Sequence, residues 1–113
     1  MAAPEPPDRG DLVWVDFNPQ KGHEQAGRRP ALVISPAAYN GISNCVLVCP
    51  ITSNLDPWPW KVPIPEGGTV TGAVLVDQIK SIDAAARHVA PAGEALGNDL
   101  MADILARLAT LTG

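Results

Sequence analysis

The sequence has little cysteine, no long apolar run and no excess of basic residues. Its 113 residues include two cysteines, eight Lys and Arg and twelve Asp and Glu, which gives a net charge of −4. No apolar stretch approaches the ~20 residues that a membrane-spanning helix needs. A general nucleic-acid-binding protein usually carries a basic excess, which this chain does not have. Any binding of nucleic acid must therefore depend on a local basic site.

The two cysteines, Cys45 and Cys49, lie four residues apart in one β-rich segment. Four strand steps separate them by ~13 Å, whereas a disulfide needs Cα atoms within ~7 Å. They cannot pair with each other in that strand, and two free thiols are typical of a reducing cytosol. Their spacing and the lack of a nearby histidine also argue against a metal site. We therefore expect a cytoplasmic protein with no metal and no cofactor.

The composition is that of one globular domain. Hydrophobic residues make up 46% of the chain and charged residues 18%, which excludes a disordered protein. Residues 1–8 have neither a basic n-region nor an apolar h-region, so they do not resemble a signal peptide. We expect residues 1–8 to be a frayed tail and residues 9–113 to form the single domain.

Short apolar segments separated by Pro and Gly turns predict a mainly β fold. The expected strands or extended segments are Leu12–Phe17, Pro30–Ser35, Val46–Ile51, Lys61–Pro65 at an edge, Gly72–Ile79 and Arg87–Ala90. One helical turn is expected at Pro36–Asn40. The only long helix is predicted over Asn98–Thr112, with Asn98 as its N-cap. This pattern favours a small, curled antiparallel barrel with a helix packed against it.

The loop of residues 18–29 carries the strongest chemical signal. Lys21, Arg28 and Arg29 surround a single carboxylate, Glu24. RNA can be cut without metal when the ribose 2′-OH attacks the adjacent phosphate, which needs a base, an acid and a cation for the phosphorane. Arg29 suits the cation role because its planar fork pairs with phosphate oxygens and keeps its charge. Pro30 biases Arg29 toward an extended conformation at the edge of the barrel.

Other side chains offer proton transfer and hydrogen bonding, each with a simpler alternative. Glu24 is a candidate base or an orienting group for Arg29, and His23 could also accept a proton. Thr52, at the end of a strand, can hydrogen-bond a phosphate oxygen. The simpler interpretations are a solvated Glu–Arg ion pair, an exposed histidine and a structural threonine. Trp58 either stacks on a base or packs against the core, and Trp60 is expected to pack.

Four segments together resemble the MazF/PemK toxin endoribonucleases, nearest to the chromosomal MazF branch. They are the motif GDLVWVDF followed by EQAGRRPALVIS, the segment PITS, the segment GAVLVDQIKSID and the terminal helix. The resemblance implies an SH3-like barrel, a homodimer and metal-independent, ribosome-independent, sequence-specific cleavage of single-stranded mRNA. It also implies 2′,3′-cyclic phosphate and 5′-OH ends, and inhibition by a cognate MazE-like antitoxin with a disordered acidic tail.

The resemblance also implies roles for particular residues. Arg29 and Thr52 match the catalytic pair of the family, and Glu24 matches a residue that supports activity and substrate binding. The residues expected to bind RNA are Asp16, Phe17, Asn18, Gln20, Lys21, His23, Gln25, Arg28, Ser53 and Gln78. One branch of the family uses an Arg two residues before the Asp of its DQ motif. Leu75 occupies that position here, so Asp77 is expected to be structural.

Two other function classes compete with the nuclease hypothesis. A CcdB-type gyrase poison shares the barrel but cuts nothing, and it depends on an aromatic residue followed by a Gly-Ile pair at the end of its terminal helix. The last five residues here are ATLTG, which do not match. An inert SH3-like binding module would have no need for Arg29 and Thr52 as a pair. The nuclease hypothesis is therefore the leading one.

Overall fold

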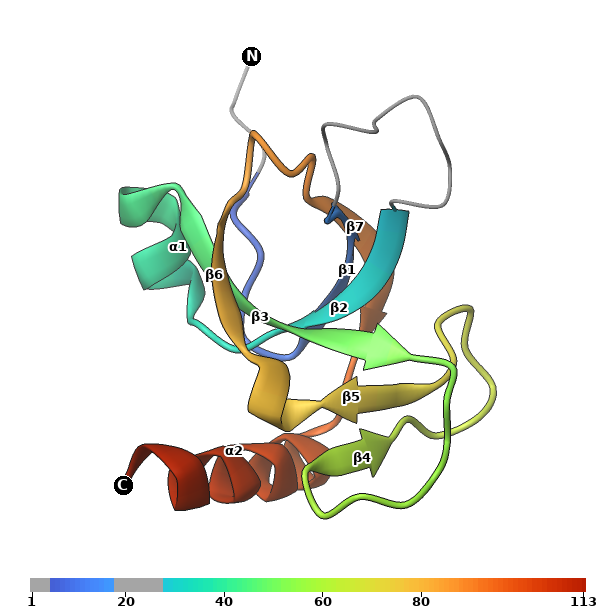
Figure 1. Ribbon diagram of the computed structural model, residues 1–113. Helices are drawn as coiled ribbons and strands as arrows, with labels where there is room; N and C mark the ends of the chain where they lie inside the picture. Colours follow the sequence, from blue (N-terminus) through green and yellow to red (C-terminus); the bar gives the residue numbers. More distant parts are fainter. Residues whose placement is uncertain (1–4, 18–27) are drawn as a thin grey trace.

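The computed structural model describes residues 5–17 and 28–113 (Figure 1). Seven strands, two α-helices and one 3-10 helix follow one another along the described chain. They are β1 (Asp11–Asp16), β2 (Arg28–Val33), α1 (Ala37–Ser43), β3 (Cys45–Thr52), β4 (Lys61–Pro63), β5 (Ala73–Leu75), η3 (Val76–Gln78), β6 (Lys80–Asp83), β7 (Ala90–Ala95) and α2 (Asn98–Thr112). The expected mainly β fold with a terminal helix is confirmed.

All strand pairings are antiparallel. The strands follow the order β4-β5-β3-β2-β1-β7, and β6 pairs with the first half of β3. The sheet curls so that its strands form a ring in Figure 1, but β4 and β7 are not hydrogen-bonded to each other as strands. The sheet is therefore barrel-like and open. β4 lies at one end of the order, as the prolines of Lys61–Pro65 predict.

The alternation of side chains divides the apolar residues of β1, β2 and β3 between two clusters. One cluster, here called the helix-side core, includes Leu32, Cys49 and Ile104 of α2. The other, here called the ring core, is built from Val13, Val15, Ala31, Val33, Val46, Val48 and Ile82. Because successive residues of a strand point to opposite faces, each of these three strands serves both clusters. Both faces of the central strands are therefore buried.

The terminal helix α2 lies across one end of the sheet, below β5 and beside β4 in Figure 1. Met101 and Ile104 are buried, and Leu100 and Leu108 pack on the helix-side core, as the helical spacing predicts. The bounds Asn98–Thr112 agree with the sequence prediction. The N-cap does not, because Gly97 occupies that position and no side chain caps the helix.

Two strand predictions are wrong. The segment Gly72–Ile79 is not one strand, because β5 ends at Leu75 and the 3-10 turn η3 redirects the chain into β6. The segment Arg87–Ala90 is mostly turn, with His88 at φ 51°. The actual strand, β7, extends to Ala95 and contains a proline and a glycine, which sequence patterns penalise. A strand at the end of the sheet tolerates both residues, because one side of it makes no ladder bonds.

The segment before β1 and helix α1 also differ from expectation. The helix extends to Ser43 through Gly41, instead of ending at Asn40, and Asn44 ends it in the left-handed conformation at φ 61°. The carbonyl of Pro7 accepts a hydrogen bond from the Asn40 side chain at 2.8 Å. The Asp8 carboxylate accepts one from the Ala37 amide at 2.9 Å. Residues 7 and 8 are therefore attached to α1, although the sequence places them in a frayed tail.

A carboxylate joins the two ends of the open sheet. Glu94 of β7 accepts hydrogen bonds from the amides of Thr69 and Val70, at 2.7 and 2.9 Å, in the connection between β4 and β5. A Cβ at Gly68 would collide with the Glu94 carboxylate, so a larger residue there would force this flexible side chain to shift. We call this contact the Glu94 bridge. The Glu94 side chain thus links the two ends of the sheet, which no strand ladder joins.

Candidate active site at the rim of the ring core

Arg29 and Thr52 lie just beyond the same end of the ladder between β2 and β3. The last paired residues at this end are Ala31 and Pro50. Arg29 precedes Ala31 by two residues and Thr52 follows Pro50 by two, at the point where β3 begins to pair with β5. This is the pair that the resemblance implies as catalytic.

Both residues continue rows of the ring core into solvent. Arg29 follows Ala31 and Val33 on one face of β2, and Thr52 follows Val48 on the same face of β3. Arg29 is exposed and Thr52 is half-buried, whereas the valines behind them are buried. Because side chains alternate with a period of two, the face is decided by the apolar rows. The Arg29 guanidinium and the Thr52 hydroxyl therefore lie at the solvent-exposed edge of the ring core, here called the rim.

The position of Thr52 is further determined by its neighbours. Its hydroxyl oxygen accepts a hydrogen bond from the Asn54 amide at 3.1 Å. Gly72 has φ +121° and lies so near the Thr52 carbonyl that a Cβ there would collide with it. Glycine therefore lets β5 approach the end of β3. The hydroxyl hydrogen of Thr52 is available to donate, as phosphate binding requires.

A second group of predicted residues gathers at the ends of β1 and β2. Asp16 pairs with Arg28 across the ladder, and the Arg28 guanidinium donates to the His88 carbonyl at 3.2 Å. The Asp16 carboxylate lies 3.7 Å from Nδ1 of His88, an ion pair when that imidazole is protonated. The structure therefore joins two of the predicted RNA-binding residues to the turn before β7.

Phe17 is held from two sides by cations that the sequence analysis did not select. The Arg87 guanidinium donates to the Phe17 carbonyl at 2.7 Å. The Lys80 ammonium lies 5.0 Å from the centre of the Phe17 ring, within the range of a cation–π contact. No sequence spacing links these residues, since more than sixty positions separate them. The only signal was the alternation of Lys80 with the apolar Ile82 in a segment that resembles the family.

The other predicted RNA-binding residues are placed differently. Ser53 is exposed on the loop after β3, and Gln78 is exposed in η3. The remaining predicted residues lie outside the described part of the chain: Asn18, Gln20, Lys21, His23, Glu24 and Gln25. The geometry of the proposed base therefore stays a prediction.

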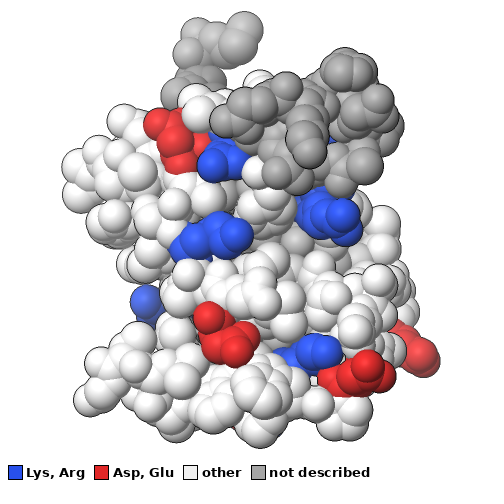
Figure 2. All heavy atoms as spheres, viewed as in Figure 1, with Lys and Arg blue, Asp and Glu red and all other residues white. Residues whose placement is uncertain are grey.

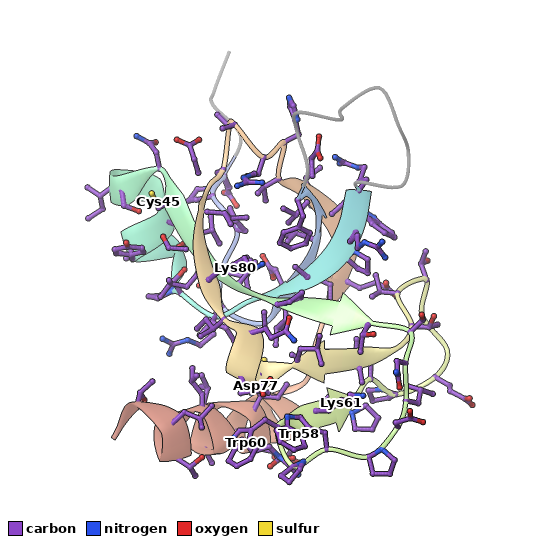
Figure 3. All side chains as sticks on the ribbon, in the orientation of Figure 1. Cys45, Trp58, Trp60, Lys61, Asp77 and Lys80 are labelled. Atoms are coloured by element: carbon purple, nitrogen blue, oxygen red, sulfur yellow. The ribbon has the colours of Figure 1, made fainter. Side chains whose placement is uncertain are left out.

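Charge is unevenly distributed over the face that carries these residues. In Figure 2, several Lys and Arg patches lie over the upper half and the middle of this face, others lie lower, and most Asp and Glu patches lie on the lower half. Figure 3 places Lys80 near the middle, beside β6, above Asp77 and Lys61. Four of the chain's eight Lys and Arg, namely Arg28, Arg29, Lys80 and Arg87, lie at or beside the rim. This is the local basic site that a chain of net charge −4 needs to bind nucleic acid.

The two tryptophans after β3 pack against the lower half of the molecule (Figure 3). Trp60 lies on the helix-side core and donates to the Thr110 hydroxyl of α2 at 3.0 Å. Trp58 remains half-exposed, donates to the Asp77 carboxylate at 2.9 Å and contacts Trp60 at a ring separation of 5.5 Å. Packing of Trp60 is confirmed, and Asp77 has a structural partner.

The described residues hold neither grouped metal-ligating side chains nor a long apolar helix. In residues 5–17 and 28–113, no three His, Cys, Asp or Glu side chains are grouped so that they could hold a metal ion. No helix within those ranges is long and apolar enough to cross a membrane. Both cysteines are free, and burial, with the Asp77 charge, raises the pKa of the Cys49 thiol to about 12. Cys49 is therefore a core residue, not a nucleophile.

Comparison with known proteins assigns the chain to a family. The model of the PemK-like, MazF-like toxins of type II toxin–antitoxin systems matches residues 8–112. The chain belongs to this family. The endoribonuclease toxin MazF of Escherichia coli K12 is 42% identical over 107 residues, which cover 95% of each chain. The endoribonuclease PemK of Escherichia coli is 34% identical and covers 92% of this chain and 80% of its own length.

Solved structures agree with the sequence comparison. MazF of Deinococcus radiodurans is 45% identical, with a TM-score of 0.83 over 96% of this chain and 97% of its own. A MazE–MazF complex from the same organism has the same TM-score at 40% identity, over 96% of each chain. Sequence and structure therefore agree that this chain is a MazF/PemK endoribonuclease toxin. The comparisons do not favour the CcdB-type alternative.

Proposed function

We propose that this member of the MazF/PemK endoribonuclease toxins cuts single-stranded RNA at the rim of the ring core, without metal, using Arg29 and Thr52. The observation that supports this most directly is that Arg29 and Thr52 continue the same face of β2 and β3 beyond the same end of their ladder. Membership of the family indicates the activity, and the positions of Arg29 and Thr52 on β2 and β3 indicate where we expect it to occur.

The chemistry follows from the two side chains. As the ribose 2′-OH attacks the adjacent phosphate, negative charge accumulates on the phosphorane oxygens. The Arg29 guanidinium stabilises that charge with two parallel N–H donors, and the Thr52 hydroxyl adds a neutral hydrogen bond. Glu24 accepts the 2′ proton or orients Arg29, with His23 as the other candidate base. The P–O2′ bond forms as the P–O5′ bond breaks, and the leaving 5′ oxygen takes up a proton from water, which gives a 2′,3′-cyclic phosphate and a 5′-OH.

The partners proposed here are a second copy of the chain and an antitoxin. The neighbouring Deinococcus radiodurans structure contains MazE with MazF, so we propose that a MazE-like protein silences this toxin. Acidic residues of such a partner would compete with RNA for Arg28 and Arg29. Two copies related by a two-fold axis would place two rims beside one groove. Light scattering at micromolar concentration measures the dimer directly.

One experiment tests the nuclease. Purified protein is incubated in EDTA with a long single-stranded RNA, with the same RNA annealed to its complement, and with a 2′-O-methyl version of the strand. Cleavage of the first strand alone, with cyclic phosphate ends, is expected. Cleavage of the 2′-O-methyl strand would contradict attack by the 2′-OH, and dependence on added metal would contradict the metal-free mechanism.

A further inference from the structure

We propose that Lys80 and Arg87 form a second phosphate-binding site for the RNA, beside Phe17 and separate from the Arg29–Thr52 pair. This proposal depends on the proposed nuclease function, because it concerns the same substrate. Its ligand is a backbone phosphate further along the strand, beyond the phosphate next to the cleaved one. Neither residue was selected from the sequence, and their proximity arises only from the fold.

The position of Lys80 follows from the register of β6. Lys80 is paired with Val48 of β3, and its side chain shares a face with Ile82 of the ring core. Thr52 lies on the same face of β3, four residues further along the strand, which corresponds to ~13 Å. Lys80 is exposed, and its ammonium lies over the Phe17 ring. It therefore faces the same side as the proposed catalytic pair, too distant to touch the same phosphate.

Arg87 brings a second cation to Phe17. Its guanidinium donates to the Phe17 carbonyl at 2.7 Å, and its own carbonyl accepts from the Asp16 amide at 2.8 Å. The turn that carries it is sharply bent, with His88 at φ 51°. One hydrogen bond uses one of the five N–H donors of a guanidinium. The backbone thus fixes Arg87 while donors remain for a phosphate.

The charges around this site favour a polyanion. The acids nearest to it in the described chain are Asp16, which lies beside His88, and Asp83, whose carboxylate accepts from the Ala86 amide at 2.9 Å. Arg28 and Arg29 continue the positive surface on the β2 side. RNA fits this surface better than an acidic peptide does, because the cations lie on the catalytic face at separated points along it. Phosphate contacts of this kind position a strand without reading its sequence.

Binding measurements on uncleavable RNA test the proposal. Random-sequence 2′-O-methyl RNA of twenty nucleotides, labelled for fluorescence anisotropy, is titrated with wild type and Lys80→Ala in EDTA at several salt concentrations. Lys80→Ala is expected to weaken binding roughly three- to tenfold. It is also expected to make the log–log salt slope shallower by about 0.7, the value for one phosphate contact on a single strand. Arg87→Ala should change the slope by a similar amount.

Two controls separate phosphate binding from other effects. Lys61→Ala removes the same charge from the lower half, where the Lys61 ammonium donates to the Asp56 carbonyl at 2.8 Å. It is expected to leave affinity and slope nearly unchanged. A trinucleotide without terminal phosphates carries only two adjacent phosphates, which cannot span the ~13 Å between Thr52 and Lys80, so Lys80→Ala should bind it like wild type. Lys80→Arg should restore binding of the long strand.

Four outcomes would overturn the proposal. Lys80→Ala and Lys61→Ala could weaken RNA binding equally, or Lys80→Ala could leave the salt slope unchanged. Lys80→Ala could also weaken binding of the trinucleotide as much as binding of the long strand. Finally, Lys80→Ala could weaken binding of an acidic peptide and leave RNA binding unchanged. An equal loss on the trinucleotide would mean that Lys80 only positions Phe17. If wild type neither binds nor cuts RNA, the proposed function fails as well. If wild type does both and Lys80→Ala matches it, only the second phosphate site is wrong.

Discussion

The rim of the ring core and the Glu94 bridge use charge in opposite ways. At the rim, Arg28, Arg29 and Lys80 are exposed cations, and their hydrogen-bonding capacity is largely turned toward solvent. At the bridge, the Glu94 carboxylate is half-buried and both oxygens are occupied by backbone amides. A charge with its partners in place stabilises a fold, whereas a charge whose partners are missing is available to a ligand. The comparison predicts that the two regions respond to mutation in different assays.

The largest expected effect is on catalysis at the rim. Arg29→Ala should lower the cleavage rate by at least ~10²-fold, because it removes the cation that stabilises the phosphorane. The free energy of unfolding should change by less than ~0.5 kcal/mol, since the side chain is exposed. Cleavage of a labelled RNA and urea denaturation measure the two quantities. Arg29→Lys keeps the charge and should recover only part of the rate. Wild-type cleavage by Arg29→Ala would contradict the assignment.

The second effect is on stability at the bridge. Glu94→Ala leaves the amides of Thr69 and Val70 without their acceptor and should lower the free energy of unfolding by about 1–3 kcal/mol. The nuclease rate at a temperature well below the melting point should remain within about twofold of wild type. Glu94→Gln keeps one acceptor oxygen and should lose less. A loss of activity as large as that of Arg29→Ala would erase the distinction between the two regions.

A smaller effect is expected at Thr52. Thr52→Ala should lower the cleavage rate by about tenfold, less than Arg29→Ala does, because a neutral hydrogen bond is weaker than a charge-assisted one. Thr52→Ser retains the hydroxyl and serves as the matched control. Single-turnover kinetics measure the step directly. The assignment of Thr52 to phosphate binding fails if the alanine and serine variants lose the same rate.

The smallest effect is on the pH dependence of the free energy of unfolding, which reports whether water reaches the helix-side core. The pKa of Cys49 is raised to about 12 from an ordinary value of 9.0, so the folded state retains a proton that the unfolded state loses. Stability must therefore fall as pH rises above 9, by about 0.8 kcal/mol between pH 8 and pH 9.5. Urea denaturation of wild type and Cys49→Ala at these two pH values gives the difference. Equal pH dependence in both proteins would mean that water reaches the thiol.

Several features could be predicted from the sequence because they depend on local chemistry. Short apolar runs bounded by turn residues indicate β1, β2 and β3, and helical spacing indicates α2. Pro30 after Arg29 predicts an extended arginine, and Arg29 lies in β2. The strand β2 begins two residues earlier than expected, since Arg28 and Arg29 pair with β1. The family motifs predicted the activity, because they record the residues that the chemistry needs.

The tertiary structure decided everything that depends on residues far apart in the chain. The 3-10 turn η3 and the strand β7 contradicted local patterns, because ladder partners and sheet edges outweigh propensity. Lys80 and Arg87 meet at Phe17, and Glu94 meets Thr69, only when the sheet curls. That Arg29 and Thr52 flank the same end of the β2–β3 ladder is likewise a result of strand pairing. The sequence by itself determined which charged groups are present, and the curl of the sheet decided which of them lie exposed near one another and which accept hydrogen bonds from backbone amides.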